Sequence, residues 1–277
     1  MIFSLWIDKD LRTSKIVYKG SPFDWWIISL QLQSCPGPLL NHCLCSFGIS
    51  WSKPQLADSE TGENGICKSI YLGCDGSVLL NSTASSPAER DAHVNFGLRG
   101  VEEVDEIKAE LESACPGTVS CADILILAAR EATVKVGGPW WPVALGRKDG
   151  SVSVDLLADG NLPFPVLNFS LLVDNFARKN FSAREMVVLS GAHTIGKSHC
   201  NGILPHLYNF TGADNANDID PAMDKGFAAF LKEKCPQGNR TNTIFLDSTA
   251  HRFDRAYYKN VLAGRGVFIT DSALITE

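Results

Sequence analysis

The clearest repeating pattern of hydrophobic positions lies between residues 98 and 136. Apolar side chains recur every three or four positions, with acidic residues between them, at Val101, Val104, Ile107 and Leu111. This spacing is typical of an amphipathic helix whose apolar stripe faces a core. Cys115-Pro116-Gly117 should end the helix, because proline and glycine do not continue one.

A second helix is predicted directly after this break. Ser120 can act as its N-cap, and Asp123 stands three positions on, a spacing similar to that of a capping box. Residues 122–136 are nearly all apolar or small, so this helix should be buried and central. Gly137-Gly138-Pro139 should end it.

Two further helices are predicted downstream. Residues 168–179 form a third amphipathic segment, and Ser182 with Glu185 makes a capping box for a buried helix that carries residues 186–192. His193 should lie near the inner end of that helix, and Gly196 offers a place to stop it. Small residues at 190–192 should leave open space for a large flat ligand. A lone histidine on such a face is more often a satisfied core residue than a ligand, so the pattern alone leaves both interpretations open.

The start of the chain follows no such pattern. Residues 1–70 show no sustained helical or strand period. We expect an irregular or mistranslated segment there, followed by one domain at residues 71–277. Residues 1–6 are apolar, but charged residues follow at once, so no secretory signal peptide is recognised.

Composition narrows the possible functions. The net charge of −6 gives no electrostatic reason to bind nucleic acid, and no apolar run approaches the roughly 18 residues that a membrane span needs. Nine cysteines favour an oxidising secretory route, and their odd number leaves at least one thiol over. Asn-x-Ser/Thr sequons point the same way and begin at Asn81, Asn168, Asn180, Asn209 and Asn239.

Residues 189–196 read Leu-Ser-Gly-Ala-His-Thr-Ile-Gly and match throughout the proximal haem-ligand motif of the secretory plant (class III) peroxidases. Residues 119–124, 137–149 and 246–258 also resemble signatures of that family, in its order. The resemblance implies a mainly α, plant-type haem peroxidase fold with haem b between a distal and a proximal half. It implies a secreted monomer of the cell wall or vacuole that oxidises small phenolic donors with hydrogen peroxide, as in peroxide removal and the response to oxidative stress.

The resemblance also assigns roles to single residues. His193 would be the axial ligand of the haem iron, Asp271 would hold its other ring nitrogen, and Pro163 would line the entrance for aromatic reductants. The family's proximal calcium site would correspond to Thr194, Asp247, Thr249 and Asp254. Its distal calcium site would correspond in part to Gly73, Asp75, Ser77 and Glu89. Without the resemblance, Asp271 would be an ordinary turn carboxylate, Pro163 would belong to a rigid turn, and the two calcium sets would be polar loops.

Disulfide pairings are implied in the same way. Cys200 would pair with Cys235, Cys35 with Cys115, and Cys67 with Cys74. The family partner of Cys121 is absent, since no cysteine follows Cys235, and we interpret this as a truncated C-terminus.

One landmark of the family is missing. The distal helix, with a core close to Arg-Leu-x-Phe-His-Asp-Cys-Phe-Val, does not appear before Gly73. Its His and Arg supply the general base and the cation that peroxide cleavage needs, and neither His42 nor His93 is a good substitute. We therefore expect impaired activity. The alternatives are a catalytically inactive haem-binding or structural relative, or a defective gene model.

Overall fold

The computed structural model describes residues 6–8, 15–19, 25–29, 74–95 and 97–276 of the chain. They form two compact units, which we describe separately. The N-terminal unit takes its described residues from Ile2–Lys135 and Pro139–Asp155, and the C-terminal unit takes them from Val136–Gly138 and Leu156–Glu277. The predicted roles of Gly73, Cys35 and Cys67 fall outside the described residues.

The N-terminal unit contains a small antiparallel sheet that the hydrophobic pattern does not predict. Its strands β1 (Trp6–Asp8), β2 (Lys15–Lys19) and β3 (Trp25–Ser29) pair in the order β1-β2-β3. Isoleucine, valine, tyrosine and tryptophan are frequent in these strands, and such side chains suit a pleated backbone. Their apolar residues follow one another directly, as in Ile16-Val17-Tyr18 and Trp25-Trp26-Ile27-Ile28, so the sequence shows no alternating period.

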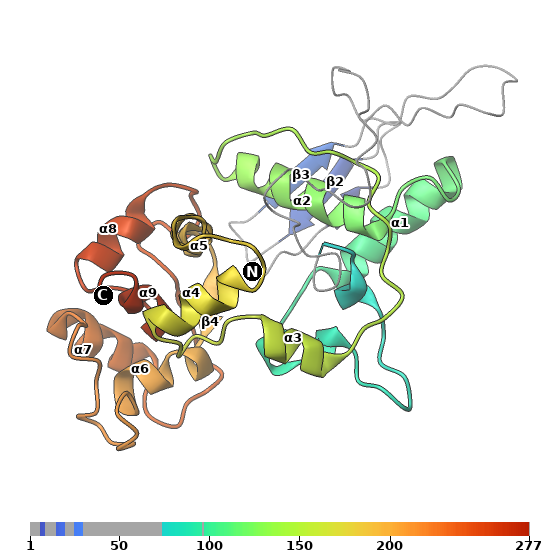
Figure 1. Ribbon diagram of the computed structural model, residues 1–277. Coiled ribbons are helices and arrows are strands. Elements are labelled where there is room, and N and C mark those ends of the chain that lie inside the picture. Colours follow the sequence, from blue (N-terminus) through green and yellow to red (C-terminus); the bar gives the residue numbers. More distant parts are fainter. Residues whose placement is uncertain (1–5, 9–14, 20–24, 30–73, 96, 277) are drawn as a thin grey trace, which may run out of the picture. The chain divides into compact units, whose positions relative to one another are not determined.

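Helices α1 (Val101–Ala114) and α2 (Cys121–Lys135) pack against each other in this unit (Figure 1). Both were predicted, and α1 buries the four residues of the predicted apolar stripe. Short 3₁₀ turns precede them at Ser77–Leu79, Glu89–Asp91 and His93–Asn95.

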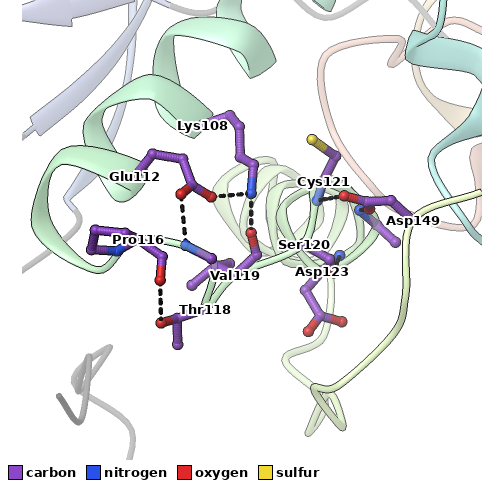
Figure 2. Close-up of polar contacts among 11 residues, drawn as sticks. Lys108, Glu112, Pro116, Thr118, Val119, Ser120, Cys121, Asp123 and Asp149 are labelled. Carbon is purple, nitrogen blue, oxygen red and sulfur yellow. Dashed lines mark hydrogen bonds and ion pairs between the residues drawn. The ribbon is translucent and has the colours of Figure 1, made fainter. Parts of the chain in front are cut away.

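The start of α2 differs from the prediction in one respect (Figure 2). Ser120 Oγ accepts a hydrogen bond from the Asp123 amide at 3.1 Å, as an N-cap should. Asp123 does not complete a capping box, because its carboxylate accepts hydrogen bonds from Gly146 and Arg147 instead. The Asp149 carboxylate caps the first turn, accepting from the Cys121 and Ala122 amides at 3.0 and 2.8 Å.

The turn between α1 and α2 is held by charged side chains (Figure 2). The Lys108 ammonium contacts both the Glu112 carboxylate and the Val119 carbonyl. Glu112 also accepts from the Gly117 amide at 2.7 Å, so one lysine–glutamate pair on α1 satisfies two backbone groups of the turn.

The C-terminal unit is also mainly helical (Figure 1). Its helices are α3 (Asp155–Asn161, which begins at the boundary of the units), α4 (Phe169–Ala177), α5 (Ala183–Ser190), α6 (Leu204–Tyr208), α7 (Lys225–Lys234), α8 (Ala256–Leu262) and α9 (Ile269–Ala273). Strands β4 (Lys197–His199) and β5 (Thr243–Phe245) form an antiparallel pair. No helix in the described part of the chain has the length and apolar character needed to cross a membrane.

The core of the C-terminal unit surrounds the predicted disulfide between Cys200 and Cys235. Both cysteines are fully buried, their Cα atoms are 5.4 Å apart, and Ile203, Leu207 and Leu231 of the same core are fully buried too. A second, smaller cluster joins α4, α5 and α9 through Leu172, Met186 and Ala273. The second cluster packs α5, which leads to His193, against α9, which carries Asp271.

Candidate functional site

His193 lies on a 3₁₀ turn, Gly191–Thr194, that continues directly from α5. The predicted capping box of Ser182 and Glu185 starts α5, and Gly196 ends the segment with a left-handed φ of 100°. The prediction that the helix is buried holds for one face only, because Met186 is 0 % exposed while Val188 is 64 % exposed. His193 therefore stands just past the end of a half-buried helix.

The imidazole of His193 is held by Asp271, as predicted. Nδ1 of His193 lies 2.9 Å from Oδ1 of Asp271, although the two residues are 78 positions apart. Asp271 is 2 % exposed and sits in the first turn of α9, where its Oδ2 reaches back to the Phe268 amide at 2.9 Å. Oδ2 also accepts from the Val267 amide, and Oδ1 accepts from the Tyr257 hydroxyl at 2.9 Å.

This arrangement keeps the Asp271 carboxyl ionised. Burial raises the pKa of this carboxyl, but the electrostatic interaction with His193 and the hydrogen bonds from His193, Phe268 and Tyr257 outweigh burial and lower the pKa below its usual range. Because an ionised carboxylate only accepts hydrogen bonds, Nδ1 of His193 must carry the proton. The other ring nitrogen is Nε2. Among the described residues, no hydrogen-bond partner contacts that nitrogen, and the side chain is 37 % exposed.

Aromatic rings limit the rotation of His193. The ring of Phe268 contacts its edge at a centroid distance of 5.3 Å, and the ring of Tyr257 does so at 5.9 Å. Burial raises the pKa of the Tyr257 hydroxyl, and the neighbouring Asp271 carboxylate raises it further, so this hydroxyl remains a donor.

The expectation of open space beside His193 is wrong at Gly191. A Cβ atom at this position would lie 2.2 Å from the hydroxyl oxygen of Tyr258, which donates to the carbonyls of Val187 and Val188. The glycine is needed because the tyrosine already fills the space next to the helix end. Sequence reasoning missed this contact, since Tyr258 is far away in the chain.

A cluster of oxygen atoms lies immediately after His193. Thr194 Oγ1 is 2.8 Å from an Asp247 oxygen and 3.4 Å from an Asp254 oxygen, and Thr249 Oγ1 is 3.2 and 3.1 Å from the same two carboxylates. The structure thus brings all four predicted proximal-site residues together. Each hydroxyl has a single proton and can donate only one hydrogen bond, so the two hydroxyls cannot donate in all four of these contacts at once.

The charge of this cluster suits a hard cation. Asp247 is 9 % exposed, and within the described residues no lysine, arginine or histidine pairs with it. A hydrogen bond from the Ala256 amide lowers the pKa of Asp254, which keeps that carboxylate ionised. Two carboxylates and two hydroxyls are the oxygen ligands that calcium prefers.

The described part of the predicted distal calcium loop also converges. Ser77 donates from Oγ to the Glu89 carboxylate at 2.9 Å and from its amide to the Asp75 carboxylate at 3.1 Å. Burial raises the pKa of Glu89, and the nearby charge of Asp75 raises it further. These three residues line a cavity of about 250 Å³ whose other walls include α2 and Arg147.

The remaining predicted positions have simple settings. Pro163 is half-buried between α3 and α4. His93 is exposed, and the Asn95 side chain donates to the Glu89 carbonyl at 2.7 Å. Cys74 and Cys115 are both disulfide-bonded, whereas Cys121 is a free thiol.

Comparisons with known proteins show the class to which this mainly helical chain belongs. The chain matches the family described as "Peroxidase" over residues 48–277. It is 50 % identical over 207 residues to "Peroxidase 1" of Oryza sativa subsp. japonica, 46 % over 209 to "Peroxidase 66" of Arabidopsis thaliana, and 49 % over 208 to "Peroxidase 3" of Arabidopsis thaliana.

The chain therefore belongs to the peroxidase family. The matched segments cover 74 % of this chain and 63 % of the length of each of those relatives.

Proposed function

We propose that this chain binds haem b, with Nε2 of His193 as the axial ligand of the iron. The observation that carries the proposal is the hydrogen bond from Nδ1 of His193 to the buried Asp271 carboxylate, which leaves Nε2 of a half-exposed ring without a partner among the described residues. Metal-binding histidines are characteristically held in this way. When bound, haem would supply the redox chemistry with hydrogen peroxide.

The chain's own residues would hold and orient this ligand. Asp271 keeps the proton on Nδ1 and increases the donor strength of Nε2, while Phe268 and Tyr257 limit rotation of the ring. Pro163 remains our proposed contact for an aromatic donor at the entrance.

The reaction we propose is the oxidation of small phenolic donors by hydrogen peroxide, the activity of the family. We expect it to be slow, because no His-Asp-Cys sequence precedes Gly73 to provide a general base close to the reacting oxygen. The same observation favours a second candidate function, a haem-binding relative without turnover.

A haem titration followed by an assay tests both candidates. The chain should take up haem with a sharp Soret band, yet oxidise a phenolic donor at below about 1 % of the rate of an intact relative under the same conditions, since the base and the cation each contribute on the order of a hundredfold or more. Failure to take up haem would refute the proposal. A rate equal to that of the intact relative would refute the expected impairment.

We also propose that calcium binds the cluster of Thr194, Asp247, Thr249 and Asp254. Thr194 adjoins His193, and Asp254 lies two residues before α8, which carries Tyr257. A bound ion would therefore stabilise the segments that hold His193 and its partner in place. The distal loop of Asp75, Ser77 and Glu89 is a weaker proposed site, as its remaining ligand lies outside the described residues.

Adding calcium to the chelator-treated chain should raise its free energy of unfolding. The gain should be about 2.7 kcal/mol when free calcium exceeds the dissociation constant a hundredfold. Asp247→Asn should abolish most of this gain in urea unfolding experiments, whereas the matched change Asp105→Asn, on the exposed side of α1, should leave it largely intact. An equal loss in both variants, or no gain in the parent, would contradict the proposed site.

The proposed location is an extracellular or vacuolar compartment reached through the secretory route. The Cys200–Cys235 disulfide is one support, because such bonds persist in oxidising compartments. Exposed sequon asparagines are another, namely Asn81, Asn168, Asn180 and Asn209.

A further inference from the structure

A second histidine, His206 on α6, is completely buried and bonded on both sides. Its Nδ1 lies 3.0 Å from the Val267 carbonyl oxygen, and its Nε2 lies 2.7 Å from Oδ2 of Asp220. A carbonyl can only accept a hydrogen bond, and so can an ionised carboxylate. Nδ1 therefore donates to the Val267 carbonyl, and Nε2 faces the Asp220 carboxylate with the Ser272 hydroxyl also close, at 3.3 Å.

The surroundings of Asp220 keep its carboxyl ionised. Burial raises the pKa of the Asp220 carboxyl, but the hydrogen bonds from His206 and from the Ala222 amide together lower it below its usual range. Asp220 is 4 % exposed, so the pair is buried with its hydrogen bonds satisfied. Such pairs are costly to break, because one partner is left charged and unpaired.

The Val267 peptide connects this pair to the proposed haem ligand. Its carbonyl faces His206, while its amide donates to Oδ2 of Asp271 at 3.1 Å. The next amide, of Phe268, donates to the same oxygen. The loop has little freedom on the other side, since a Cβ atom at Gly266 would lie 2.8 Å from Cβ of Asp271.

We infer that His206 is a positioning residue for His193, acting through the Val267 peptide and Asp271. The imidazole of His206 fixes the carbonyl side of the peptide, the amide side fixes the Asp271 carboxylate, and the other carboxylate oxygen fixes Nδ1 of His193. The ionised Asp220 holds the His206 ring in place through Nε2, at the start of this series of hydrogen bonds. The inference rests on the proposed role of His193, but each contact in it belongs to the protein alone.

The test replaces the imidazole by an aromatic ring that has no hydrogen-bonding nitrogen. In His206→Phe without haem, the Val267 and Phe268 amides should exchange with deuterium about ten times faster, because a buried hydrogen bond that steadies their peptide is lost. The NMR signal of the His193 Nδ1 proton should weaken or move upfield. His206→Arg supplies several charged donors and should recover part of both effects. If His206→Phe does not fold, His206→Gln, a neutral donor, should show the same two changes to a smaller degree.

Tyr208→Phe is the matched control, because Tyr208 is on the same helix, is buried, and donates its hydroxyl proton to the Cys235 carbonyl. It should leave the Val267 amide and the His193 proton unchanged. Unchanged signals in the His206 variants, or equal losses in Tyr208→Phe, would overturn the inference. In haem-loaded protein, the iron–histidine stretching band should shift in His206→Phe. If the haem-free protein behaves as expected but takes up no haem, the proposed function is refuted, whereas the positioning role of His206 stands.

Discussion

Replacing Asp271 by asparagine is expected to destabilise the protein by about 3 kcal/mol or more, because a buried carboxylate that accepts four hydrogen bonds is lost. The amide of asparagine has only one oxygen, and its NH₂ group would face donors that remain in place. The free energy of unfolding from urea titration measures the effect. Tyr257→Phe is the matched control, since it removes one donor to the same oxygen and should cost only about 1 kcal/mol.

The same variant should also change the pH dependence of stability. The pKa of Asp271 is lowered in the folded protein, so its contribution is present above the ordinary value of 3.8 and is lost as the pH falls through the folded-state pKa. The stability difference between the parent and Asp271→Asn should therefore shrink in acid below that value. A difference that stays constant with pH, or a cost no larger than that of Tyr257→Phe, would contradict the role given to the carboxylate.

Removal of the Cys200–Cys235 disulfide is the second large expected effect. The double variant Cys200→Ala, Cys235→Ala should unfold with about 3 to 4 kcal/mol less free energy, because a loop of 35 residues becomes unconstrained in the unfolded chain. Both side chains are fully buried in the main core of the C-terminal unit, so alanine also leaves unfilled volume.

Reducing agent separates these two contributions. The parent should lose most of its advantage over the double variant when its disulfides are reduced, while the double variant should change much less. If the parent and the variant are equally stable under oxidising conditions, the disulfide contributes nothing and the prediction is wrong.

The sequence predicts the helices that have a local pattern of hydrophobic or capping residues. Helix α1 follows from its apolar stripe, and α5 follows from the capping box of Ser182 and Glu185. The contact between His193 and Asp271 was expected only through resemblance to a family, because no local pattern connects residues 78 positions apart. The hydrogen bond itself is now a feature of the structure, whereas haem binding remains our proposal.

Other features of the fold depend on contacts between residues far apart in the sequence, which the hydrophobic periodicity does not predict. Asp149 caps α2 from 27 and 28 positions away, and Asp123, which has the spacing of a capping box, holds the Gly146 amide instead. Tyr258 occupies the space beside Gly191, where the small side chains predict open space. Strands β4 and β5 have three residues each, which is too short for an alternating pattern to predict them.

The most direct test of the central claim is the iron–histidine stretching band in the resonance Raman spectrum of the reduced, haem-loaded chain. We predict that the band is present in the parent, shifts when the histidines are labelled with ¹⁵N, and disappears in His193→Ala. An unchanged band in His193→Ala would show that another residue binds the iron and would contradict the account.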